Sequence, residues 1–402
     1  MTEAGPALKN HLKTVTQLIQ RVPGISKPEI SRQTGLTASA VHGIVSFLQE
    51  RGVVKCVGAA GSSGGRRAAM YMIPQELGFF VGVSIRIDRL EMGLFDMSLR
   101  PGKKKTLSLW MQDMGPETYA SFAAQAIGEF MEEAQMPRED CFGIGVTVPG
   151  PVDFQKGVVL EIAAAPLWQQ YPLKQRLSDA LSIPVAVDKD VYAGIRYLEY
   201  AGKMQSRECT AYVSICEGIG AALLIHGEVF RGSHSLSGEI GHLTVRKDGI
   251  PCSCGNTGCL ELYCSDIGIV KQYNAQTGSH LNRVEEVTAL VEKDDPVARK
   301  VFSQAVGYLV DTTSTIIMNY DPEELLIYCT WLNQQRALFF RMLDALYAKS
   351  IFTKRHTVDI RLMDPEPINL PAAATLAATE LLFRGGSRMA ELLEGSSDSA
   401  SF

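Results

Sequence analysis

The sequence predicts an α/β protein in three parts, a small helical module followed by two lobes of similar construction. Three observations lead to this prediction. Two hydrophobic strand pairs, beginning at Phe79 and Cys209, each open a half of the chain in which strands and helices then alternate. The first 74 residues favour three short helices instead. A polar segment rich in cysteine and glycine interrupts the second half.

Composition indicates a globular, intracellular protein. The 402 residues are 46% hydrophobic and 21% charged, and they suffice for two or three domains with cores of their own. We find no signal-peptide pattern at the N-terminus and no apolar run that approaches a membrane span. Nine cysteines, several scattered singly, form no disulfide framework. We therefore expect a cytoplasmic protein without membrane insertion.

The N-terminal module is predicted to be a winged helix-turn-helix over residues 1–74. Apolar residues recur every three or four positions over 7–21, Ser26 can cap a second helix over 27–33, and Thr37 a third over 38–51. Two strands then flank a Gly/Ser-rich turn, which forms the wing. The module carries a net charge of +6 and the remaining chain −11. This asymmetry favours contact with a polyanion such as DNA.

The helix-turn-helix geometry predicts which side chains meet DNA. The start of the third helix faces base edges in the major groove, and a basic wing contacts phosphates or the minor groove. A module that docks another protein is the alternative. The candidate DNA contacts are Thr37, Ser39, Ala40, His42, Gly43, Arg66 and Arg67.

Both lobes are predicted to begin with a strand pair, and their repeated order suggests duplicated lobes with a ligand cleft between them. We place the first lobe at 78–195, the second at 196–385 and a partly disordered tail at 386–402. The strand pairs cover 79–96 and 209–225. The other expected elements are helices near 116–135, 173–181, 285–320, 333–349 and 371–383, and strands at 141–148, 184–187, 325–328 and 357–362.

The polar segment holds a candidate metal site. His242 and the thiols of Cys252, Cys254 and Cys259 are the ligand set of a closed tetrahedral zinc site. Pro, Ser, Gly, Asn and Thr surround the thiols, which argues against three buried core cysteines. Four protein ligands leave no position for water, so we expect one structural zinc per chain rather than hydrolytic chemistry.

Two carboxylates in the same segment are not needed by the metal. Glu239 and Glu261 stand close to the ligands in sequence. A zinc that fixes one ring nitrogen of His242 would leave the other nitrogen, with these carboxylates, to hydrogen-bond a polyhydroxyl ligand.

Three stretches together resemble the ROK family, which groups sugar kinases with sugar-responsive transcriptional repressors on an actin-like (ribonuclease H-like), two-lobed fold. They are GIGVTVPGPVD at 143–153, GEIGH at 238–242 and CSCGNTGCLE at 252–261. The resemblance covers about residues 78–385. A helix-turn-helix in front is the arrangement of the family's repressors.

The resemblance implies roles for individual residues. Lys189 stands where the family's kinases have Asn, and it would either pair with Asp190 or meet an anionic effector such as a phosphosugar. Asp190 occupies the position of the kinase base, although we expect no catalytic residue here. The implied zinc ligands are His242, Cys252, Cys254 and Cys259, and the implied sugar contacts, with the neighbouring Lys189, are Gly150, Asp190, Glu239, His242 and Glu261.

Departures from the kinases argue against phosphoryl transfer. Phosphate-binding turns need glycines so that backbone N–H groups approach the phosphates. The first such turn, 84–89, has no glycine, and the second contains Glu217, whose carboxylate would face phosphates. Tyr328 and Cys329 replace a Gly-Gly pair expected near the adenine. We therefore expect a protein that is not an enzyme.

The sequence thus predicts a sugar-responsive DNA-binding regulator, a repressor of genes for carbohydrate uptake or catabolism. Its effector would be a sugar or sugar phosphate in the cleft. Helix-turn-helix half-sites lie about one DNA turn apart, so a homodimer or homotetramer on a double-stranded operator is expected. The alternatives are a sugar kinase with a fused DNA-binding domain and a regulator controlled by a protein partner.

Overall fold

The N-terminal module folds around three helices and a small sheet. In the computed structural model, which describes residues 6–59, 68–205, 207–349, 358–364, 368–379 and 388–394, the hydroxyls of Ser26 and Thr37 cap the second and third helices as expected. The wing tip with Arg66 and Arg67, and residues 395–402 of the expected tail, lie outside the described residues. The elements are α1 (Pro6–Arg21), β1 (Ile25–Ser26), α2 (Lys27–Thr34), α3 (Ala38–Glu50), β2 (Lys55–Ala59) and β3 (Ala69–Met72).

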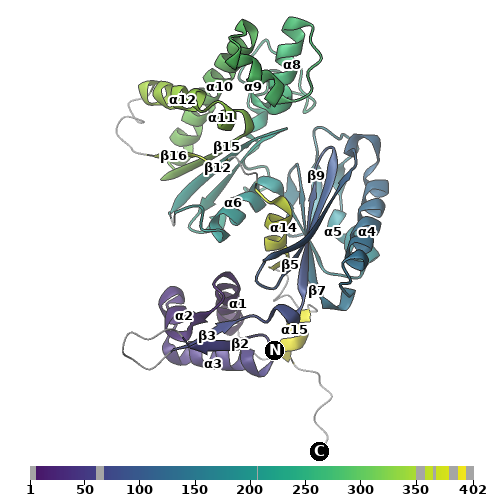
Figure 1. Ribbon diagram of the computed structural model, residues 1–402, viewed down its shortest axis with the longest axis vertical. Coiled ribbons are helices and arrows are strands. Elements are labelled where there is room, and N and C mark those ends of the chain that lie inside the picture. Colours follow the sequence, from purple (N-terminus) through teal and green to yellow (C-terminus); the bar gives the residue numbers. More distant parts are fainter. Residues whose placement is uncertain are drawn as a thin grey trace, which may run out of the picture.

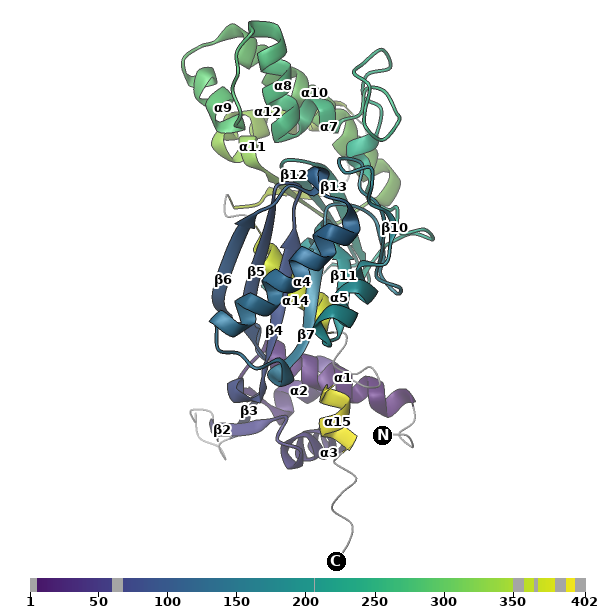
Figure 2. The same ribbon diagram turned by 90° about the vertical axis from the view of Figure 1, so that its right-hand side faces the viewer.

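The first lobe is a five-stranded sheet in the order β11-β7-β4-β5-β6. Strands β4, β7 and β11 run parallel, while β5 and β6 extend the sheet as antiparallel neighbours. Helices α4 and α5 pack on one face (Figure 2). The bounds are β4 (Phe79–Ile85), β5 (Arg89–Asp96), β6 (Pro101–Ser108), α4 (Pro116–Glu133), β7 (Cys141–Val148), α5 (Leu173–Leu181) and β11 (Val185–Lys189).

A small sheet that the sequence did not predict follows β7. Its three short antiparallel strands are β8 (Val152–Asp153), β9 (Val158–Glu161) and β10 (Gln169–Tyr171). The buried side chains of this sheet join the core of the first lobe through Trp168, which is fully buried.

The second lobe repeats the strand pair and the parallel strands in the order β14-β13-β12-β15-β16. Alternate residues of β12 face opposite sides of the sheet. Val213 joins the core under the helices between β14 and β16, and Tyr212 packs towards α6. The elements are α6 (Asp190–Tyr200), β12 (Cys209–Ile215), β13 (Ile219–Ile225), β14 (Glu228–Val229), α7 (Glu261–Cys264), α8 (Asp266–Thr277), α9 (Val284–Glu292), α10 (Pro296–Tyr320), β15 (Glu324–Cys329), α11 (Thr330–Gln334), α12 (Arg336–Lys349) and β16 (Asp359–Leu362).

After β16 the chain returns to the first lobe. Helix α14 (Leu370–Thr379) lies across the sheet face opposite α4 and also packs against α6 (Figure 1). A side chain at Gly82 would place its Cβ 1.8 Å from the carbonyl oxygen of Pro371, and one at Gly145 would lie 1.8 Å from that of Ala374. The expected second lobe, 196–385, therefore includes a helix that belongs to the first sheet.

The expected tail also contains a helix, α15 (Arg388–Glu394), which contacts the N-terminal module (Figure 2). Met389 and Leu393 are buried in one core with residues of the module and of the first lobe. Gln20 donates a hydrogen bond of 2.7 Å to the carbonyl of Met97, which joins α1 to the first lobe directly. The module is thus packed onto the body at the end of an elongated molecule (Figure 1). In the described part of the chain, every helix is too short or too polar to span a membrane.

Candidate functional site

The four predicted metal ligands come together in the loop after β14. The ligand atoms of His242, Cys252, Cys254 and Cys259 all lie within 4.8 Å of one another. Isolated bridges, one between residues 244 and 259 and one between 251 and 257, fold the loop back on itself. Gly258 permits this fold, because it has a φ of 72° and a Cβ there would lie 1.7 Å from the carbonyl oxygen of Arg246.

The donor chemistry of this cluster fits a metal ion. The Cys254 and Cys259 sulfurs are 3.7 Å apart, and Nδ1 of His242 is 3.7 Å from the Cys252 sulfur. Burial and the neighbouring thiols of Cys252 and Cys254 raise the pKa of Cys259 to about 12. Such thiols become thiolates at neutral pH only beside a cation, and one imidazole with three sulfurs is a tetrahedral ligand set.

His242 lies between the other predicted metal ligands and the carboxylates of Glu239 and Glu261. While Nδ1 faces the Cys252 sulfur, Nε2 is 4.0 Å from a carboxylate oxygen of Glu239. Glu261 begins α7, and its carboxylate accepts a hydrogen bond of 3.0 Å from the backbone N–H of Ile219. A metal on Nδ1 would therefore fix the direction in which Nε2 meets the carboxylates.

The junction between β11 of the first lobe and α6 faces this loop, because Lys189 there contacts Glu239. Asp190 is the first residue of α6, directly after β11, and in the parallel register Lys189 is opposite Val148, two residues before Gly150. Burial raises the pKa of Asp190 above its ordinary value, although Arg86 and Lys189 oppose the shift. Burial likewise raises the pKa of Glu261, and the charges of Glu239 and Asp190 add to it. The predicted sugar contacts thus converge from both lobes.

Lys189 pairs with Glu239 instead of Asp190, the carboxylate partner considered in the sequence analysis. Its side chain is only 4% exposed, and Nζ donates to the carboxylate of Glu239 and, at 3.4 Å, to the carbonyl of Ser237. The expected ion pair with Asp190 is not found. Glu239 is reached more easily because it comes from the facing loop, whereas the carboxylate of Asp190 accepts a bond of 2.7 Å from Val191 N–H of its own helix.

A second ion pair across the cleft was missed by the sequence analysis. Arg231 Nη2 donates to Asp188 at 2.8 Å, and the guanidinium carbon lies 4.2 Å from the ring centroid of Phe154. Asp188 is the penultimate residue of β11 in the first lobe, and Arg231 follows β14 in the second lobe. The pair therefore joins the two lobes. The only sequence signal was a lone arginine before Gly232, which is too weak to identify a partner.

The two turns that the sequence analysis compared with phosphate-binding turns also meet between the lobes. Arg86, at the end of β4, donates to the carboxylate of Glu217 in the β12–β13 turn, and Arg89 donates to the same carboxylate at 3.2 Å. Burial opposes ionisation, but the two guanidiniums hold the pKa of Glu217 below its usual value. We call this arrangement the Arg86–Arg89–Glu217 clasp.

In the N-terminal module, the predicted DNA contacts lie at the start of α3. Thr37 is the cap, Ser39, His42 and Gly43 are exposed, and Ala40 is half-buried. Gly43 occupies the helix interior, and a Cβ there would meet nothing within 4 Å. A helical glycine costs about 0.5–1 kcal/mol relative to alanine, and no packing contact of this position requires it.

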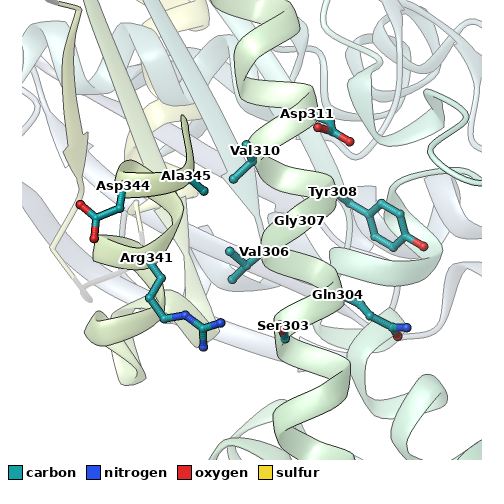
Figure 3. A pocket seen from close by; sticks show the side chains of 10 residues that line it. All are labelled: Ser303, Gln304, Val306, Gly307, Tyr308, Val310, Asp311, Arg341, Asp344 and Ala345. Atoms are coloured by element: carbon teal, nitrogen blue, oxygen red, sulfur yellow. The ribbon is translucent and has the colours of Figure 1, made fainter. Parts of the chain in front are cut away.

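A surface groove lies away from this site. A shallow groove of about 860 Å³ runs between α10 and α12, with Tyr308, Arg341 and Asp344 among its lining residues (Figure 3). None of the predicted site residues lines it. The groove is therefore separate from the candidate site.

Known proteins resemble both the N-terminal module and the lobes of this chain. A winged helix-turn-helix DNA-binding family matches residues 15–55. The xylose repressor of Bacillus subtilis (strain 168) is 27% identical over 322 residues, which cover 79% of this chain and 81% of the repressor. The DNA-binding transcriptional dual regulator NagC of Escherichia coli (strain K12) is 27% identical over 323 residues, 78% of each chain.

A solved structure shares the whole architecture. It is a ROK family transcriptional regulator described as a homologue of the E. coli MLC protein, with a TM-score of 0.78 and 22% identity over 97% of this chain and 100% of its own. ROK-family hexokinases and glucokinases share the lobes without the module. The ROK family itself matches residues 81–369, which is most of the sequence, and this chain therefore belongs to the ROK family.

Proposed function

We propose that this protein is a sugar-responsive transcriptional repressor of genes for carbohydrate uptake or catabolism. The observation that carries the proposal is the shared core of the winged module, α15 and the first lobe, because it ties the module to a body in which polar groups of two lobes meet. The related proteins named as xylose repressor and NagC support it. Operator binding requires access to the chromosome, so we infer a cytoplasmic protein.

The effector in this proposal is a sugar bound between the lobes. The carboxylates of Asp190, Glu239 and Glu261, with Nε2 of His242, suit a ligand with several hydroxyl groups. Gly150 is proposed to contribute backbone groups, and it must be a glycine because a Cβ there would lie 2.5 Å from the carbonyl oxygen of Glu161. Lys189 is already paired with Glu239. This pairing favours a neutral sugar over a phosphorylated one, because an anionic effector would have to compete with that carboxylate.

The metal in this proposal is one structural zinc ion on His242, Cys252, Cys254 and Cys259. All four ligands come from the protein, so the ion would serve to hold the loop and the His242 ring. The residues of this chain then do the binding: Glu239 and Glu261 accept hydrogen bonds from the ligand, while His242 presents Nε2.

We further infer that the protein is not a kinase. The Arg86–Arg89–Glu217 clasp lies at the two turns that correspond to phosphate-binding turns in the family's kinases. A carboxylate there repels phosphates, and the arginines that could offset it are engaged by that carboxylate. Asp190 would therefore bind a sugar hydroxyl without transferring a phosphoryl group to it.

Regulation is proposed to act through lobe closure. A sugar that binds one closure angle more tightly shifts the population towards it. Because α14 packs on both the first sheet and α6, and α15 follows it onto the module, a change between the lobes would alter how two modules are spaced in a homodimer or homotetramer. The proposed DNA contacts are Thr37, Ser39, Ala40, His42 and Gly43, with Arg66 and Arg67 of the wing.

The test is binding of the purified protein to DNA from its own upstream region at several salt concentrations. The sugar panel would contain xylose, hexoses, N-acetylglucosamine and their phosphates. We expect specific, salt-sensitive binding that one sugar weakens. ATP-dependent phosphorylation of a panel sugar, or DNA binding without sequence preference, would contradict the proposal. Specific binding that no sugar alters would favour a protein partner as the signal.

A further inference from the structure

Helix α3 carries a histidine whose ring is held by the neighbouring helix. Lys27, the first residue of α2, places Nζ 3.1 Å from Nδ1 of His42. The same ammonium is 5.2 Å from the ring centroid of Tyr71, a buried residue of β3. Nε2 of His42 makes no hydrogen bond to the described residues, and the side chain is exposed. The ammonium of Lys27, which lies against the Tyr71 ring, therefore contacts one ring nitrogen of the exposed His42.

This contact determines which tautomer the ring adopts. A lysine ammonium carries three donors and no acceptor, so Nδ1 of His42 must accept the hydrogen bond. A neutral imidazole has one proton, which then resides on Nε2. His42 thus presents a single N–H donor to whatever approaches α3. Without Lys27, both tautomers would be available and the ring could accept as well as donate.

A donor at this place discriminates among base edges. In the major groove guanine offers two acceptors, N7 and O6, whereas thymine offers the single acceptor O4 beside its methyl group, adenine presents one acceptor beside a donor, and cytosine presents a donor. The neighbouring Gly43 is exposed and has open space at its Cβ position, which lets the helix approach a groove closely. An Nε2–H donor next to such a position matches guanine best.

We propose that Lys27 is a positioning residue for operator recognition, which fixes His42 as the Nε2–H tautomer so that it donates to a guanine at one operator position. The inference rests on the proposed DNA-binding function and deepens it. The competing explanation is that Lys27 contacts a phosphate. A phosphate contact would strengthen binding to all sequences equally and add about one unit to the salt slope.

The first experiment observes the ring in the DNA-free, full-length protein. Histidine is labelled with ¹⁵N, and the His42 signals are assigned by their loss in His42→Gln. We expect an unprotonated Nδ1 and a protonated Nε2 in the wild type, and a mixture of tautomers in Lys27→Met, which retains the aliphatic stem. Lys55→Met is the matched control, because Lys55 Nζ bonds Glu76 at 2.7 Å in the same module. A predominantly Nδ1–H ring in the wild type would overturn the inference.

The second experiment measures affinity for operators in which each guanine is replaced in turn by 7-deazaguanine, which lacks N7, or 2-aminopurine, which lacks O6. At one operator position, the replacement should lower the affinity of the wild type and of Lys55→Met roughly fivefold, because one hydrogen bond is lost. The same replacement should leave the affinity of His42→Ala unchanged. Lys27→Met should lose most of that sensitivity. An equal loss of affinity for every operator by Lys27→Met overturns the inference alone, whereas a wild type without a specific operator overturns the proposed function as well.

Discussion

Replacing Glu217 with glutamine should loosen the contact between the lobes. The change removes the carboxylate charge to which both Arg86 and Arg89 donate, and with it the attraction that holds these two turns together. Removing one partner of a fully buried ion pair costs about 3–5 kcal/mol. The Arg86 side chain is 15% exposed and that of Glu217 39% exposed, so solvent screening reduces the cost. We expect about 1–2 kcal/mol, a five- to thirtyfold shift in the closure equilibrium.

The assay compares Glu217→Gln with Glu91→Gln. Glu91 also contacts Arg89, at 2.8 Å, but both residues belong to β5, so this control removes the same charge within one lobe. Small-angle X-ray scattering should give a larger radius of gyration for Glu217→Gln, and amide exchange should accelerate in the β12–β13 turn. The double variant Arg86→Gln/Glu217→Gln should recover part of the loss. Identical scattering and exchange in the two single variants would refute the reasoning.

Three further predictions concern the metal, a buried acid and a close helix contact. Cys254→Ser should lose about one zinc per chain in metal analysis, whereas Cys56→Ser, at an exposed cysteine outside the cluster, should keep it; full metal content in both would exclude the proposed ligands. Burial raises the pKa of Asp266 from 3.8 to about 7, so the folded state retains a proton that the unfolded state has lost, and stability should fall as the pH rises from about 4 to 7. Asp266→Asn should flatten this dependence in urea unfolding, and an unchanged slope would refute it. Gly145→Ala should lower the free energy of unfolding by about 1–3 kcal/mol or more, because α14 must move to make room for the methyl group. The control Gly307→Ala has nothing within 4 Å of the new methyl group and should raise the free energy of unfolding by about 0.5–1 kcal/mol. Equal effects of the two variants in chemical denaturation would show that the contact between Gly145 and α14 is not tight.

Local patterns were sufficient for most elements of the fold. Ser26 and Thr37 cap helices because a hydroxyl three residues before an N–H can satisfy it without help from distant residues. Strand β6 was missed because Pro101–Ser108 is exposed and lysine-rich, which is how an edge strand avoids aggregation but not how a buried strand is recognised. The packing of α14 on the first sheet could not be predicted either. It depends on close contacts with Gly82 and Gly145, which are far from α14 in the sequence.

The candidate site likewise contains features that local sequence predicts and features that depend on distant residues. The four residues of the candidate metal cluster could be predicted because three of them lie within one short loop whose glycines allow it to close, and the structure brings all four together. The partner of Lys189 was wrong because Glu239 reaches it from the other lobe, and the pair Arg231–Asp188 was missed for the same reason. Charges that pair across a cleft are decided by the packing of whole lobes, which no local pattern records.

The position of α15 has a consequence for the order in which this protein becomes functional. The DNA-binding module leaves the ribosome first, and domains generally fold as they emerge. Met389 and Leu393, which complete the core beneath it, are made only after both lobes. A nascent or C-terminally clipped chain would therefore carry an N-terminal module whose contact with the lobes is not yet complete.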